Sequence, residues 1–122
     1  MDVLNMAADT LALDSQTNAT ASAALAAPGA GFKWRVVAWG ASFSGTFSAN
    51  PVRATISNIG SGGGIGAGVG FNNPWHVSLA HPLDAPSNTG VTLALPAGGA
   101  STVGDVWIAA FKVPTLPAYV GP

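Results

Sequence analysis

Apolar and polar side chains alternate in short runs along most of the chain, a spacing of two that is typical of half-buried β-strands. Residues 32–40 show this spacing most clearly, with the sequence FKWRVVAWG. One face of this strand is predicted to carry Phe32, Trp34, Val36 and Ala38, and the other to carry Lys33, Arg35, Val37 and Trp39. The segment therefore reads as a strand with one face on a core.

The same alternation predicts further strands at residues 17–25, 52–59, 75–80, 90–96 and 105–113, with a weaker strand or hairpin edge around Phe43 and Phe47. Turn-forming residues separate them at 28–31, 50–51, 81–88 and 97–104. No run with helical spacing is long enough for the crossover that joins parallel strands. Six to eight short strands predict an all-β domain, an antiparallel β-sandwich or jelly roll, spanning residues 16–113.

The two ends of the chain differ from this body. Residues 1–15 are predicted to form an N-terminal arm, and the helix-like spacing of its apolar residues leaves both a short helix and an extended segment open. Residues 114–122 contain three prolines and are predicted to form an extended C-terminal tail that lies against another surface. The start is acidic and no apolar run nears the ~20 residues of a membrane helix, so we expect neither a secretory signal nor a membrane span.

Residues 61–76, SGGGIGAGVGFNNPWH, form the most glycine-rich stretch of the sequence. Gly62, Gly64 and Ala67 formally fit the looser dinucleotide-binding pattern, which functions only between a strand and a helix. Asn72-Asn73-Pro74 follows and does not open a helix. The stretch is therefore predicted to be a flexible or extended loop without a phosphate site.

Charge is scarce in this sequence. Four Lys and Arg residues face five Asp residues, and charged residues make up 7% of the chain, against roughly 25% in an ordinary domain. Four basic residues cannot form the footprint that nucleic acids or anionic membranes require, so neither is expected as a partner. A surface so thinly charged tends to associate, and we expect neighbouring subunits to cover much of it.

The residues needed for catalysis or metal binding are few and poorly spaced. His76 and His81 lie five residues apart, which places them on opposite faces of a strand, and only Asp84 follows nearby. The sequence contains no cysteine and no Gly-x-Ser-x-Gly motif. Asp84 and Asp105 are the only carboxylates beyond residue 15. We therefore assign no catalytic, cofactor or metal residue, and expect that the protein is not an enzyme.

Four tryptophans are the strongest candidates for core or contact residues. Trp34 and Trp107 lie on alternating apolar faces of their predicted strands and are expected in the core. Trp39 shares its predicted face with Lys33, and Trp75 follows the glycine-rich stretch. These two are the candidate interface residues, exposed anchors at a subunit contact or platforms for a sugar ring.

Two stretches resemble a known class of proteins. Residues 26–45, AAPGAGFKWRVVAWGASFSG, and residues 75–113, WHVSLAHPLDAPSNTGVTLALPAGGASTVGDVWIAAFKV, resemble small β-sandwich structural proteins of tailed bacteriophages, of the head decoration or cement type. The resemblance covers residues 16–113 as a style of sequence and carries no catalytic residues.

This resemblance implies a virion protein on the outer surface of the capsid, where a homotrimer would bridge and stabilise subunits of the major capsid protein. An arm and a tail would suit such a role, because they can reach neighbouring subunits. The alternative is a tail, baseplate or receptor-binding module with a similar sandwich, including one that binds carbohydrate. All of these functions are mechanical or adhesive, and none needs a cofactor.

Overall fold

The computed structural model describes residues 10–45, 52–59, 63–70 and 74–115, and all of their regular structure is β-strand. The eight strands are β1 Thr10–Thr17, β2 Ala21–Leu25, β3 Phe32–Gly45, β4 Val52–Ile59, β5 Gly63–Val69, β6 Trp75–Asp84, β7 Val91–Leu95 and β8 Thr102–Pro114. The prediction of an all-β fold is confirmed. Within these ranges there is no helix long and apolar enough to cross a membrane.

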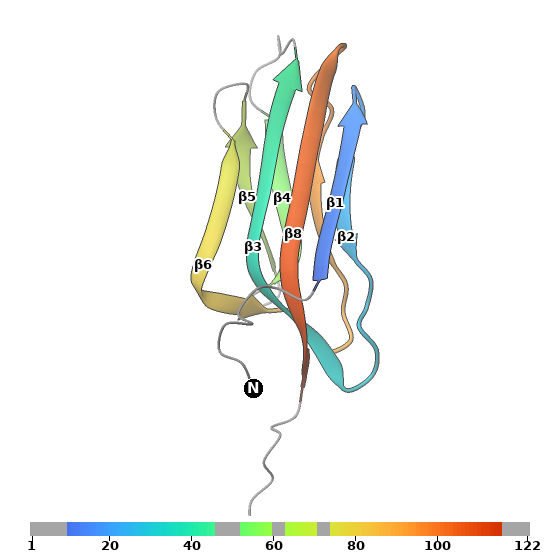
Figure 1. Cartoon of the computed structure of the whole chain (residues 1–122), viewed down its shortest axis with the longest axis vertical. Helices are drawn as coiled ribbons and strands as arrows, with labels where there is room; N and C mark the ends of the chain where they lie inside the picture. The colour runs from blue at the N-terminus through green and yellow to red at the C-terminus, as the bar shows by residue number, and fades with distance from the viewer. Residues whose placement is uncertain (1–9, 46–51, 60–62, 71–73, 116–122) are drawn as a thin grey trace, which may run out of the picture.

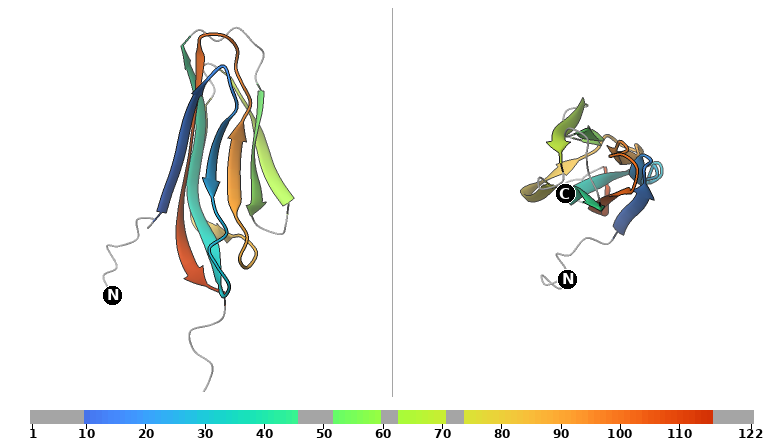
Figure 2. Two further views of the ribbon diagram at one scale, coloured as in Figure 1. Left: turned by 90° about the vertical axis from the view of Figure 1, so that its right-hand side faces the viewer. Right: turned by 90° about the horizontal axis from the view of Figure 1, so that it is seen from above.

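The strands form two four-stranded antiparallel sheets packed as a sandwich (Figures 1 and 2). Sheet A has the order β1-β8-β3-β6 and sheet B the order β2-β7-β4-β5. The pairs β1·β8, β2·β7, β3·β6 and β4·β5 correspond to one long hairpin, with arms β1–β4 and β5–β8, rolled into two layers. This topology is the jelly roll that the strand pattern predicts.

The core lies between the sheets and is built by the alternation seen in the sequence. In β2 and β7, every second side chain is buried and its neighbours are exposed or half-buried. β4 follows the same alternation up to a register shift between Ser57 and Ile59, after which Ile59 is buried. The largest fully buried side chains are Trp39, Ile56, Leu93, Leu95, Ile108, Val36, Val69, Val91, Val106 and Thr102. Nine of these ten are apolar, so burial of their surface is the main stabilising term.

A β-bulge in β3 changes which side chains reach the core. Against β8 the register shifts by one residue between Val36 and Ala38, so Val37 is an extra residue relative to β8. The register against β6 is irregular at the same point. An extra residue reverses the alternation beyond it. Trp34 and Val36 face inward before the bulge, and Trp39 faces inward after it. The prediction that Trp39 is exposed beside Lys33 was therefore wrong: its side chain is 1% exposed.

The glycine-rich stretch contains a strand, so the prediction of a loop was wrong for residues 63–69. β5 pairs with β4 in antiparallel register from Val52↔Val69 to Ile59↔Gly63. Ile65 lies opposite the buried Ile56, and glycines alternate with these apolar residues on the other face. The alternation was present in the sequence, but glycine composition hid it. Residues 60–62 and 71–73 lie outside the described ranges.

The N-terminal boundary of the sandwich also differs from the prediction. Residues 10–15, assigned to the arm, belong to β1, which pairs along its whole length with β8 from Thr10↔Ala110 to Thr17↔Val103. The boundary predicted between residues 15 and 16 thus falls inside a strand. Residues 1–9 of the arm and 116–122 of the tail lie outside the described residues.

Candidate interaction surface

The outer face of sheet A, called the A face below, carries large apolar side chains that the other described residues leave uncovered. Leu11 and Leu13 project from β1 and are 60% and 67% exposed. Their register partners on β8 are Ala109 and Trp107. Exposed leucines that neighbour other apolar side chains on a sheet face are typical of a contact surface.

Trp107 occupies the middle of the A face, whereas the sequence predicted it in the core. In β8 the buried positions are even-numbered, so Trp107 points outward and is half-buried. Its indole lies across Gly40 of β3, since a Cβ built on Gly40 would meet Trp107 Cε2 at 2.7 Å. The His76 ring on β6 lies beyond, with its centroid 6.4 Å from that of the indole. Gly40 thus allows the tryptophan to lie flat over the sheet.

Two shallow hollows flank Trp107 on this face. The first has a volume of about 410 Å³ and is lined by Leu11, Leu13 and Trp107 with the more polar Ser15 and Asp105. The second has a volume of about 580 Å³ and lies beside the bulge. Its lining includes Val37, Ala38, Ala80, Pro82, Ala109 and Phe111. The face therefore combines an indole that lies over the sheet with two depressions lined mainly by apolar side chains.

One end of the A face carries a cluster of two cations and one carboxylate. Asp84 on β6 accepts bonds from Arg35 Nε at 2.8 Å and from Arg35 Nη2 at 3.1 Å. Lys33 Nζ lies 2.7 Å from the same carboxylate. The Arg35 hydrogen bonds, with a smaller contribution from Lys33, lower the pKa of Asp84, and Asp84 in turn raises the pKa of Arg35. This end has a net charge of about +1 from these three groups.

The other end of the A face carries one carboxylate, that of Asp105, and a second carboxylate lies at the nearby edge of the sandwich. Asp105 on β8 accepts a 2.6 Å hydrogen bond from the Ser15 hydroxyl. Asp14 on β1 lies at the sandwich edge, where it accepts a 2.9 Å hydrogen bond from the Ser22 backbone N–H of β2. That bond is the main reason that the pKa of Asp14 is lowered. Charge on sheet A is thus positive at one end and negative at the other.

The outer face of sheet B is different in character. Its exposed or half-buried side chains are small or polar, among them Ser22, Arg53, Thr55 and Thr92. Gly64, Gly66 and Gly68 of β5 lie on the same side. A face of this kind interacts well with water and offers little apolar area to a partner.

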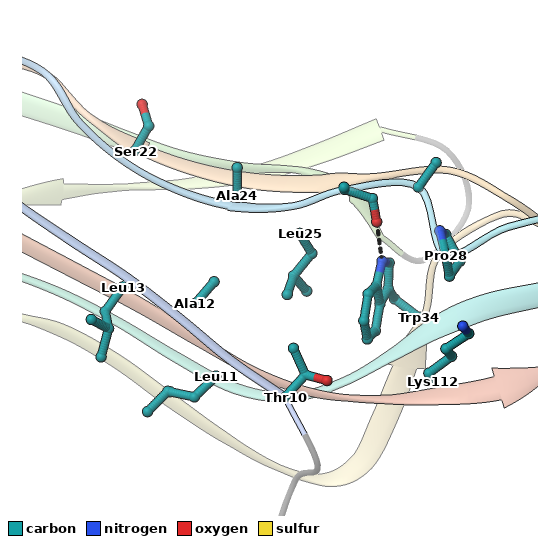
Figure 3. A pocket seen from close by; sticks show the side chains of 12 residues that line it. Thr10, Leu11, Ala12, Leu13, Ser22, Ala24, Leu25, Pro28, Trp34 and Lys112 are labelled. Carbon is teal, nitrogen blue, oxygen red and sulfur yellow. Dashed lines mark hydrogen bonds between the residues drawn. The ribbon is translucent and has the colours of Figure 1, made fainter.

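A groove between β1 and β2 forms a second candidate contact region (Figure 3). It has a volume of about 710 Å³, and Ala12, Leu25 and Trp34 point into it, whereas Leu11 and Leu13 point away. Trp34 is buried, as predicted, and its Nε1 donates a 2.7 Å hydrogen bond to the Ala26 carbonyl. The groove is flanked by two edge strands, which are common sites for extended peptide segments.

The second predicted interface residue, Trp75, lies on the inner side of β6. It is half-buried, and its ring meets that of Trp39 edge-on, with centroids 5.7 Å apart and an angle of 76°. The two tryptophans therefore form a packing pair rather than a flat exposed platform. Burial of Trp39 removes one of the two residues proposed for a sugar site, while an interface role for Trp75 stays a prediction.

The structure does not bring the remaining polar candidates into one site. His76 lies on the A face beside Trp107, His81 is exposed on β6, and Asp84 is engaged by Arg35. No group of three or more potential metal ligands occurs within the described part of the chain.

Sequence reasoning missed Leu11 and Leu13, although a usable signal was present. Residues 10–13 at the start of this strand alternate with a spacing of two, but residues 10–15 were assigned to the arm.

Comparison of the chain with protein-family profiles, with curated proteins and with solved structures found no match.

Proposed function

We propose that this protein is a structural subunit of a tailed-bacteriophage virion, a head decoration or cement protein that bridges and stabilises subunits of the major capsid protein. The observation that carries the proposal is the pair of exposed leucines, Leu11 and Leu13, on the apolar A face of a chain that has nine charged residues in all. Such a surface favours contact with other protein over isolation in water.

A bridging role requires at least two contact regions on each molecule, and the described residues offer two. The A face is apolar with charged ends and can contact another protein, a second copy of the chain included, and the groove between β1 and β2 can receive an extended segment. Many weak contacts on a repeating shell add up through avidity, so neither region needs high affinity alone. The homotrimer implied by the sequence resemblance stays a prediction, and a pair of copies is the alternative assembly.

The test mixes the purified protein with shells assembled from the major capsid protein of the same phage and measures co-sedimentation. Ala27→Arg places a long cation at an exposed position of the groove, and we expect it to weaken shell binding at least tenfold. Thr55→Arg makes the same change on the outer face of sheet B and should leave binding unchanged.

Imaging of decorated particles then distinguishes the two virion roles. A position on the outer shell between capsid subunits supports the proposal. A position on the tail or baseplate, or no binding to shells at any protein concentration, would overturn it. Receptor binding is the main alternative, and a response of the Trp75 fluorescence to a glycan panel would favour it.

A further inference from the structure

We propose that the A face binds a second copy of this chain across a two-fold axis that lies in the interface, perpendicular to the strands. Such an axis places each strand of sheet A over the same strand of the other copy, running in the opposite direction. The surface must then complement itself when its two ends are exchanged. Two features of the A face meet that requirement, and a third, its area, is sufficient for a stable contact.

The first feature is the order of large and small side chains in two adjacent rows. The cross-strand registers define a Trp107 row, Leu13–Trp107–Gly40–His76, and an Ala109 row, Leu11–Ala109–Ala38–Ser78. An axis between these rows places the Trp107 row of one copy on the Ala109 row of the other. The indole then meets a small residue and the hollow beside the bulge, and Leu13 meets Leu11.

The second feature is charge. The row beyond the Trp107 row contains Ser15, Asp105 and Ser42, and the row beyond the Ala109 row contains Phe111, Arg35 and Asp84. The same axis faces these two rows with each other. Asp105 of one copy then lies over Phe111 on β8 of the other copy. Phe111 is the cross-strand neighbour of Arg35, so the Arg35 guanidinium of the second copy can reach the Asp105 carboxylate. Opposite charges meet twice, once on each side of the axis.

The third feature is size. The four strands of sheet A contain 8, 13, 14 and 10 residues. At about 4.8 Å between strands and about 3.4 Å per residue, the face covers roughly 700 Å² in each copy. The two faces together reach about 1,400 Å², which lies within the usual range for a specific protein contact.

The first test measures the mass of the purified chain by light scattering at micromolar concentration. We expect two copies for the natural sequence and one copy for Leu13→Asp, because that carboxylate would be buried against Leu11 of the other copy. Leu13 is highly exposed in one chain, so the substitution should not disturb folding. Thr55→Asp, on the outer face of sheet B, is the matched control and should keep the mass of two copies.

The second test exchanges charges. Asp105→Arg alone and Arg35→Glu alone each place like charges together at both ends of the contact, and each should be at least tenfold weaker in pairing. A one-to-one mixture of the two variants places opposite charges together at both ends and should restore the mass of two copies. Circular dichroism of each variant verifies that it is folded.

A mass of one or of three copies for the natural sequence would overturn the two-fold contact. So would full pairing of folded Leu13→Asp, or a mixture of charge variants that pairs no better than either alone. None of these measurements uses a capsid shell, so a failure here leaves the virion role to its own test, and a failure of shell binding leaves the pairing intact.

Discussion

Trp39 is the largest fully buried side chain of the core. Its side chain is 1% exposed and packs edge-on against Trp75, and its Nε1 has no hydrogen-bond partner among the described residues. Trp39→Ala should lower the free energy of unfolding by about 3–5 kcal/mol, because it removes a large buried ring and leaves a cavity. Urea denaturation followed by circular dichroism measures the change.

Trp39→Phe distinguishes the ring from its polar atom. Phenylalanine keeps an aromatic edge for Trp75 and removes the unpartnered N–H, so the loss should be clearly smaller than for alanine. Equal losses for the two variants would contradict the packing described here.

The carboxylates of Asp14 and Asp84 make stability depend on acid. Both have a lowered pKa in the folded protein, Asp14 chiefly through the Ser22 N–H and Asp84 chiefly through Arg35. A lowered pKa contributes stability above the unfolded carboxyl pKa of about 3.9, and this contribution is lost as pH falls through the folded value. The free energy of unfolding should be flat between about pH 7 and pH 5 and fall below about pH 4.

Asp84→Asn tests this assignment. The substitution removes one of the two carboxyls with a lowered pKa. The free energy of unfolding at pH 6 and at pH 3 should therefore differ less than in the natural sequence. An unchanged pH dependence would show that another group is responsible. At neutral pH the loss should stay near 1 kcal/mol or less, because the ion pair is partly exposed.

At the scale of elements, the bulge in β3 makes a prediction about chain length. Val37 is the extra residue, and its removal leaves Val36 and Trp39 on the core side with regular alternation between them. A chain lacking Val37 should therefore fold, with loss of up to about 2 kcal/mol from altered contacts with β6.

Removal of Ala41 provides the control for that deletion. Ala41 lies in the regular part of β3, where one missing residue moves every following side chain to the opposite face. This variant should not reach a stable fold, as judged by circular dichroism and thermal unfolding. Equal behaviour of the two deletions would contradict the assignment of the bulge.

The strands that could be predicted are those whose alternation is unbroken and built from ordinary residues. β4 and β7 were predicted to within a residue or two, and β4 keeps its alternation up to a register shift between Ser57 and Ile59. β3 was correct up to Val36 and reversed after it, because a bulge leaves no signature in residue type. β5 was missed because its outward positions are glycine, which weakens an isolated strand. This segment forms a strand because it pairs with β4.

At the scale of the whole molecule, the candidate surface depended on pairing that no local pattern contains. β1 pairs with β8, about ninety residues away, and this pairing brings Leu11 and Leu13 next to Trp107. The spacing of residues 10–13 could have indicated a strand, but not which face would stay uncovered. The low content of charged residues predicted a surface that tends to associate. Only the strand topology shows where the large exposed apolar side chains lie together.

The same pairing predicts where the chain can be shortened. A chain that begins at Thr10 keeps every described strand and should retain its thermal stability to within a few degrees. A chain that begins at Asn18 lacks β1, which leaves β8 as a bare edge and exposes the core behind Ala12. We expect that shorter chain to aggregate or unfold, and light scattering with circular dichroism distinguishes these outcomes from a native fold.

β1 begins and β8 ends at the same end of the sandwich (Figure 1), where the Thr115 N–H bonds to the Gly31 carbonyl. A domain fused before β1 and a domain fused after β8 would therefore both lie at this end of the sandwich. The turn at Asn18 and the loop around Gly99 sit at the far end and would stay unobstructed by either domain. The fold therefore allows fusion at both termini while the opposite end of the sandwich stays accessible.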